Sequence, residues 1–143
     1  MCNSENLSMK LIFGLMFLFF LNVNSQNFSH ELEIIEKENQ ECLDKGKFMF
    51  NCSVKYYQEN DSLLNVVYDK INRNLNSEEK LKFSETQIEW LEIRDKEFKK
   101  INSENTGLGN GLDDKMFEYQ KKADFVSERI KYLINEFLKT LDE

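Results

Sequence analysis

The 143-residue chain carries a formal net charge of −7, from 26 acidic and 19 basic side chains. This balance argues against a nucleic-acid partner, because binding a polyanion needs a basic face that neutralises phosphates. The negative charge serves solubility, and it also suits a basic protein as partner, since opposite net charges speed association. The chain has 41% hydrophobic residues, no Pro and five Gly, which is typical of one foldable and mainly helical domain.

The N-terminal segment has the three-part layout of a secretory signal peptide. Residues 11–21 form an uninterrupted apolar run, which follows Lys10 and precedes the small and polar residues 22–25. A helix of that length rises about 16 Å, well short of the roughly 30 Å hydrocarbon core, so a cleaved leader is favoured over a permanent membrane anchor. We expect residues 1–25 to be removed, which leaves one domain over residues 26–143 in the periplasm or outside the cell.

Loss of the leader removes Cys2 and leaves Cys42 and Cys52, an even number that suggests a disulfide in an exported chain. The bond requires Cα atoms about 4.4–6.8 Å apart, whereas ten residues of unbroken helix hold them about 15 Å apart. The helix would therefore break between the two Cys, and Gly46 is the natural place. Two free thiols or a metal pair are the alternative, although the only His is His30 and zinc would need further ligands.

Apolar residues at three- and four-residue spacings predict the first two helical segments of the domain. The first is short, with a cap at Ser29 and an end at about residue 43. The second runs over about residues 48–75, and Asn60-Asp61-Ser62 is a candidate site for a kink or a restart.

A third helix is expected from a cap at Ser77 to about residue 102, with two neighbouring apolar stripes that predict packing on more than one side. Residues 105–111 are the only Gly-rich stretch and predict a loop. The last helix begins at about Leu112, and its apolar residues step by four and three; they are Leu112, Met116, Tyr119, Ala123, Val126, Ile130, Leu133 and Phe137. This seam predicts packing inside a bundle, with a homodimer through the last helix as the alternative.

The predicted fold class is therefore all-α. We expect a small antiparallel bundle of three long helices, with a short N-terminal helical segment and one disulfide.

Candidates for catalysis are poor. His30 is alone, and the many carboxylates are mixed with Lys as on a solvated surface. Gly107, Gly109 and Gly111 do not form a phosphate loop, because no strand precedes them and no Gly-Lys-Ser/Thr follows. We expect no enzyme, no cofactor and no metal site.

Several polar residues lie among apolar ones. Gln87, Trp90 and Arg94 share one helical face, and Asn65 and Arg129 lie on two other helices. The favoured interpretation is a partly buried network, in which Arg94 or Arg129 bonds Asp61, Asp95 or helix-end carbonyls while Trp90 packs in the core. A ligand site is the alternative.

These residues also carry a family resemblance. The matching positions are Cys42 and Cys52, Leu64-Asn65-x-x-Tyr68, Leu81, Gln87-x-x-Trp90-Leu91-x-x-Arg94-Asp95, a Gly-containing loop, and Ser127-Glu128-Arg129-x-x-x-Leu133. Over about residues 42–134 the chain resembles the LprI-type lysozyme-inhibitor-like domain, a family of small, helical, Cys-bearing bacterial proteins that are exported or envelope-anchored. The resemblance supports the Cys42–Cys52 pairing. A further Cys pair of many members is absent, and apolar packing of Phe98 is expected in its place.

The resemblance implies an exported inhibitor that binds a basic c-type lysozyme and occludes its acidic cleft. The candidate contact is the Gly-rich loop with its acidic neighbours, namely Gly107, Leu108, Gly109, Asn110, Gly111, Asp113 and Asp114. The alternative is an envelope binding or assembly module that uses the last-helix seam or the Trp90 face. A hydrolase is the least supported hypothesis for want of a site.

Overall fold

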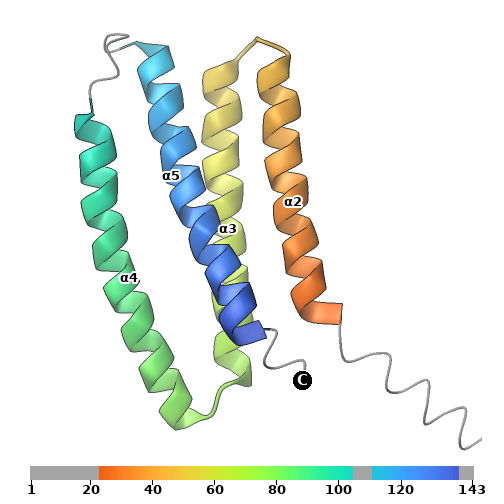
Figure 1. The fold of residues 1–143 in the computed structure, drawn as a ribbon, viewed down its shortest axis with the longest axis vertical. Coiled ribbons are helices and arrows are strands. Elements are labelled where there is room, and N and C mark those ends of the chain that lie inside the picture. Colours follow the sequence, from red (N-terminus) through yellow and green to blue (C-terminus); the bar gives the residue numbers. More distant parts are fainter. Residues whose placement is uncertain (1–22, 105–110, 139–143) are drawn as a thin grey trace, which may run out of the picture.

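The computed structural model describes residues 23–104 and 111–138, with side chains from residue 27 onward. These ranges contain α2 (Val23–Asp44), α3 (Met49–Asn74), α4 (Ser77–Ser103), α5 (Leu112–Leu133) and a π-helical turn, η2 (Ile134–Leu138). They contain no β-strand. Each long helix runs antiparallel to the one before it (Figure 1). The predicted all-α bundle is confirmed.

The first helix is longer than predicted. It begins at Val23 rather than near Ser29 and spans 22 residues. Nothing between these positions breaks a helix, and Phe28 packs against the core, which favours the added turns. The apolar run of the predicted signal peptide lies outside the described residues. The expected cleavage after Ser25 would fall in the first turn of α2, and it stays a prediction.

The turn between α2 and α3 forms as predicted. Gly46 has a φ of 63°, in the left-handed region that Gly tolerates, and its N–H donates to the carbonyl of Leu43 at 2.9 Å. The break brings Cys42 and Cys52 together in a disulfide with their Cα atoms 5.8 Å apart. Residues 60–62 were a candidate site for a kink or a restart, but the helix does not restart there, because α3 is continuous from Met49 to Asn74.

The start of α4 differs by one residue from the prediction. Asn76, not Ser77, is the N-cap, and its side-chain oxygen accepts from the N–H groups of Glu78 and Glu79 at 3.0 Å. The Glu79 carboxylate accepts in return from the Asn76 N–H at 2.8 Å. This reciprocal capping box satisfies more backbone donors than a lone Ser cap would.

The core lies mainly between α2, α3 and α5. The α5 seam contributes fully or nearly fully buried side chains at Met116, Ala123, Val126, Ile130 and Leu133. Ala123, Val126, Ile130 and Leu133 belong to the chain's own core, as the favoured interpretation predicts. Leu112, the first residue of the predicted seam, is instead 67% exposed.

The third helix is attached by one face only. Phe83, Trp90 and Ile101 of one predicted stripe are buried. In the other stripe, Leu81 and Ile88 are exposed and only Leu91 packs against the core. The expectation of packing on more than one side was wrong for this stripe, because α4 lies at the edge of the bundle (Figure 1). In the described part of the chain, no helix has the length and apolar character needed to cross a membrane.

Candidate functional site

Trp90 lies at the centre of the contact between α4 and α5. The side chain is 8% exposed and stacks on Phe125, with ring centroids 5.8 Å apart and an interplanar angle of 19°. Two guanidinium groups approach the indole ring, that of Arg129 at 5.5 Å and that of Arg94 at 5.8 Å from the ring centroid. Cation–π attraction and stacking therefore act together at this contact.

Arg129 crosses from α5 to α4. Its Nη2 donates to Oε1 of Gln87 at 3.0 Å and to the carbonyl of Thr86 at 3.4 Å. The residue is 9% exposed, and burial lowers the pKa of its guanidinium. Nε is buried without a hydrogen-bond partner in the structure. The guanidinium keeps its charge, because Arg pKa values lie far above neutrality.

The predicted polar network is confirmed in part. Arg129 does bond a backbone carbonyl, although in mid-helix rather than at a helix end. Arg94 bonds its neighbour Asp95, with Nη2 2.9 Å and Nε 3.2 Å from the same carboxylate oxygen, while Asp61 takes no part. Trp90 packs in the core as expected.

The remaining residues of the sequence motif lie elsewhere. Leu64 belongs to the core, and Tyr68 stacks on Phe83 with ring centroids 4.8 Å apart. Asn65 is exposed and donates to the backbone carbonyl of Asp61 within its own helix. The motif therefore joins α3, α4 and α5 into the fold, and Gln87, Trp90, Arg94 and Arg129 come together around the contact between α4 and α5.

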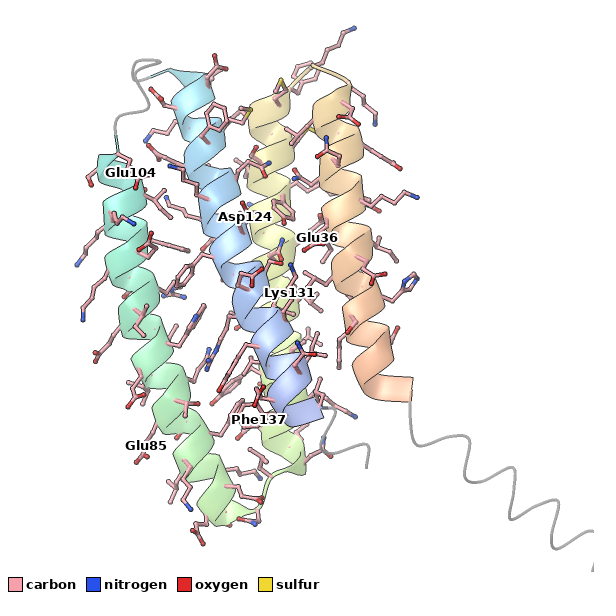
Figure 2. All side chains as sticks on the ribbon, in the orientation of Figure 1. Glu36, Glu85, Glu104, Asp124, Lys131 and Phe137 are labelled. Atoms are coloured by element: carbon pink, nitrogen blue, oxygen red, sulfur yellow. A yellow bond between two sulfur atoms is a disulfide. The ribbon has the colours of Figure 1, made fainter. Side chains whose placement is uncertain are left out.

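A groove of about 660 Å³ lies between α4 and α5, and Trp90 and Arg129 of this cluster line it. Its apolar lining comes from Trp90, Ile93, Ile101, Phe125 and Tyr132. Its charged lining comes from Glu97, Glu104, Asp124, Glu128, Lys121 and Arg129, so four carboxylates face two cations. Lys121 forms an ion pair with Glu104 across the groove, and Glu104 and Asp124 are labelled on the two helices in Figure 2. The groove therefore combines an apolar lining with an excess of carboxylates.

Asp124 also contacts the α3 side of the bundle. Its Oδ1 accepts from the Tyr56 hydroxyl at 3.3 Å. Partial burial raises the pKa of Asp124, and the nearby Glu36 carboxylate adds to that rise, while the Tyr56 hydrogen bond opposes it. Lys131 bridges Glu36 and Glu128 at 3.1 and 3.2 Å, on the same stretch of α5 (Figure 2). These contacts join α5 to α2 and α3, and their role is structural.

The predicted contact loop lies largely outside the described residues, which resume at Gly111. Gly111 is the exposed N-cap of α5, and Asp113 is exposed as well. Asp114 is only 8% exposed, and one of its carboxylate oxygens is buried without a partner in the structure. Of the two acidic neighbours of the loop, Asp113 is therefore the one whose side chain is open to a partner.

A second projecting element was missed by the sequence reasoning. Residues 45–49, here called the tip, join α2 to α3 and display the Phe48 side chain to solvent. The tip and the start of α5 lie at the same end of the bundle (Figure 1). Phe50 contacts Tyr119 of α5 edge-on, with centroids 5.8 Å apart, which fixes the start of α3 against α5. Only the exposure of Phe48, which periodicity does not reveal, marks this element.

A comparison with models of protein families identifies the family of this chain. The model of the family described as lysozyme inhibitor LprI matches residues 39–133, about two thirds of the chain. The chain belongs to the LprI family. No curated protein and no solved structure gives a significant match. The LprI family is one of inhibitors rather than of catalysts, and the described residues contain no group of acidic, His and Cys side chains that could hold a metal ion.

The resemblance predicted apolar packing of Phe98 in place of a further Cys pair. Here Phe98 lies against Tyr57 and Phe125, with centroids 5.9 and 6.1 Å apart. Phe98 therefore joins α4 to both α3 and α5. This aromatic packing agrees with the expectation that Phe98 packs against apolar neighbours.

Proposed function

We propose that this protein is an exported inhibitor that binds a basic lysozyme and blocks its substrate cleft. The family match over residues 39–133 carries this proposal. The net charge of −7 supports it, because an acidic inhibitor and a basic enzyme attract each other over several ångströms and associate faster.

Blocking a cleft requires a rigid projection and no catalytic residues. The end of the bundle that carries the tip and the start of α5 is such a projection (Figure 1). The Cys42–Cys52 disulfide and the Phe50–Tyr119 contact hold that end together. Little ordering entropy is then lost on binding, which favours affinity. We propose that the loop at 105–111 and the exposed Asp113 lie at the edge of the same contact.

The inhibitor is proposed to act as a monomer in the periplasm or outside the cell. Ala123, Val126, Ile130 and Leu133 of the α5 seam are buried within the chain's own bundle, so a homodimer would need another surface. Each molecule then presents one projecting end and is expected to block one enzyme molecule.

The test is a lysis assay with hen egg-white lysozyme and suspended bacterial cell walls. We expect the purified protein to slow lysis at micromolar concentration, and calorimetry to give a one-to-one complex whose affinity falls as salt is added. The control is the same protein after reduction, alkylation and unfolding. An unchanged lysis rate at micromolar excess would contradict the proposal, and binding without inhibition would favour a binding or assembly module.

A further inference from the structure

Phe48 is the most exposed large hydrophobic side chain among the described residues, at 81%. It stands between Lys47 and Met49 at the outer end of the bundle, and Lys45 lies two residues before Lys47. Met49 is exposed as well, so the tip shows two adjacent apolar side chains beside two Lys. Isolated apolar residues are common on surfaces, and the case for function at Phe48 rests on its backbone and its surroundings.

Local backbone preferences all disfavour Phe at this position. Phe48 has φ 55° and ψ 32°, in the left-handed region, and it is the only non-Gly residue with positive φ in the described chain. Gly and Asn tolerate this conformation, whereas a bulky side chain does not favour it. Phe48 is also the N-cap of α3 and provides no capping hydrogen bond, where Asn, Asp or Ser would. A residue that opposes its local structure and gains no burial is a candidate for a functional role.

A disulfide and backbone hydrogen bonds hold the backbone of the tip in place. The Cys42–Cys52 disulfide joins the last turn of α2 to the first turn of α3, and the Gly46 N–H closes the turn on Leu43. Phe48 itself accepts, through its carbonyl, the N–H of Cys52 at 3.1 Å. The aromatic side chain is therefore presented from a fixed backbone.

The tip is positively charged although the protein is acidic. Lys45 and Lys47 form no ion pair with any described residue, whereas Lys55 is paired with Glu38 and Glu59 at 2.8 and 3.4 Å. The carboxylate of Asp44, the nearest acidic neighbour in sequence, accepts from Gln40 at 2.7 Å. The first turn of α3 contains no acidic residue, so the positive end of the helix dipole adds to the two free Lys.

We propose that the tip enters the acidic substrate cleft of lysozyme, with Phe48 against the apolar wall of the sugar-binding surface and Lys45 and Lys47 facing its carboxylates. This inference rests on the proposed function and names the part that does the blocking. A glycoside hydrolase holds two carboxyl groups on either side of the bond that it cleaves, so its cleft attracts cations. The acidic body and cationic tip thus complement a basic enzyme with an acidic cleft.

An anionic membrane is the less favoured partner for the same tip. Each Lys near such a surface contributes only about 1 kcal/mol, and stable anchoring needs a polybasic patch or two anchors. Two unpaired Lys and one Phe on a protein of net charge −7 fall short of that requirement.

The experiment compares variants of the tip with matched controls in the lysis assay. Phe48→Asn removes the aromatic ring and keeps the left-handed backbone, and K45E/K47E reverses the charge of the tip. Leu81→Ala removes another exposed apolar side chain, which is 67% exposed and lies near the start of α4. The start of α4 is at the opposite end of the bundle from the tip (Figure 1). K80E/K96E changes the net charge by the same amount on exposed Lys of α4 that have no ion pair among the described residues.

We expect each tip variant to raise the inhibition constant by about tenfold or more, as loss of a central interface residue does, and each control to change it less than about twofold. Phe48→Asn should have an unchanged or higher melting temperature, because Asn suits both the backbone and the cap. Weaker inhibition with a retained fold separates a binding role from a structural one.

Other outcomes would overturn the inference. If the wild type inhibits lysozyme and both tip variants inhibit equally well, the tip is not the blocking element, although the proposed function stands. If the wild type neither binds nor inhibits, both fall. If phosphatidylglycerol vesicles bind the wild type but not Phe48→Asn, while inhibition is unchanged in that variant, the tip contacts membranes instead.

Discussion

Arg129 Nη2 donates a hydrogen bond to Gln87 Oε1 at 3.0 Å, and this bond joins α5 to α4 together with the longer one to the Thr86 carbonyl. The guanidinium lies over the Trp90 ring as well, with Nε buried and unpartnered. A buried charge with few partners is sensitive to the loss of any one of them.

Gln87→Leu should therefore lower the free energy of unfolding by about 1–3 kcal/mol, because it removes the main side-chain acceptor of a buried cation. Arg129→Met should be less destabilising, since it removes the buried charge and keeps an apolar stem against Trp90. The double variant should then be more stable than the sum of the two single effects predicts. Urea unfolding of the four proteins measures the coupling, and strictly additive effects would show that Arg129 does not depend on Gln87.

The disulfide should stabilise the fold without being needed for its topology. C42S/C52S is expected to lose about 2–3 kcal/mol of unfolding free energy, from the loop-closure entropy of a short crosslinked segment. Denaturation with and without reductant gives the measurement. Reductant should have no effect on C42S/C52S, and equal stability of the oxidised and reduced wild type would contradict the prediction.

Helix α4 should open more readily than its neighbours α3 and α5. It buries three of its 27 residues, whereas α3 buries eight of 26 and α5 eight of 22. Few buried side chains are typical of segments that unfold locally. Hydrogen exchange should be faster in α4 than in α3 and α5, and Trp90, the only Trp in the chain, should shift its fluorescence before helicity is lost. Uniform exchange across the three helices would contradict this.

Asp124 should destabilise the fold slightly at neutral pH. Its pKa is raised in the folded protein, first by partial burial and then by Glu36, so the folded state binds the proton more tightly than the unfolded state. Its contribution to stability is then highest below the unfolded pKa, falls as pH rises through the raised folded pKa, and stays unfavourable above it. Asp124→Asn should raise stability at pH 7 by less than about 1 kcal/mol, because the carboxylate is partly solvated. Thermal unfolding at pH 4 and pH 7 tests this, and a larger gain at pH 4 would refute it.

Local sequence patterns were enough to predict the all-α fold class and the Cys42–Cys52 disulfide. The absence of Pro, the apolar spacing of α5 and the Gly46 break between Cys42 and Cys52 all act within a few turns of helix, so they can be read along the chain. The helix start at Asn76 was misplaced by one residue, because Asn and Ser both cap well and only the return bond from Glu79 selects Asn76.

Positions in space needed the tertiary structure. The pairing of Gln87 with Arg129 joins residues 42 apart in sequence, and no periodicity predicts which helix faces which. The exposure of Leu81 and Ile88 follows from the place of α4 at the edge of the bundle, although their spacing resembles that of a buried stripe. The exposure of Phe48 at the tip also could not be predicted from periodicity.

The sequence by itself determined an acidic, all-α, Cys-stapled domain of the LprI family, because composition, helix periodicity and motif spacing are local properties. Only the tertiary structure decided which apolar residues are buried, that Asp114 is largely hidden, and that Phe48 is exposed beside Lys45 and Lys47 at the end of the bundle that holds the start of α5. Burial depends on which surfaces meet when the helices pack, and that is a property of the whole chain.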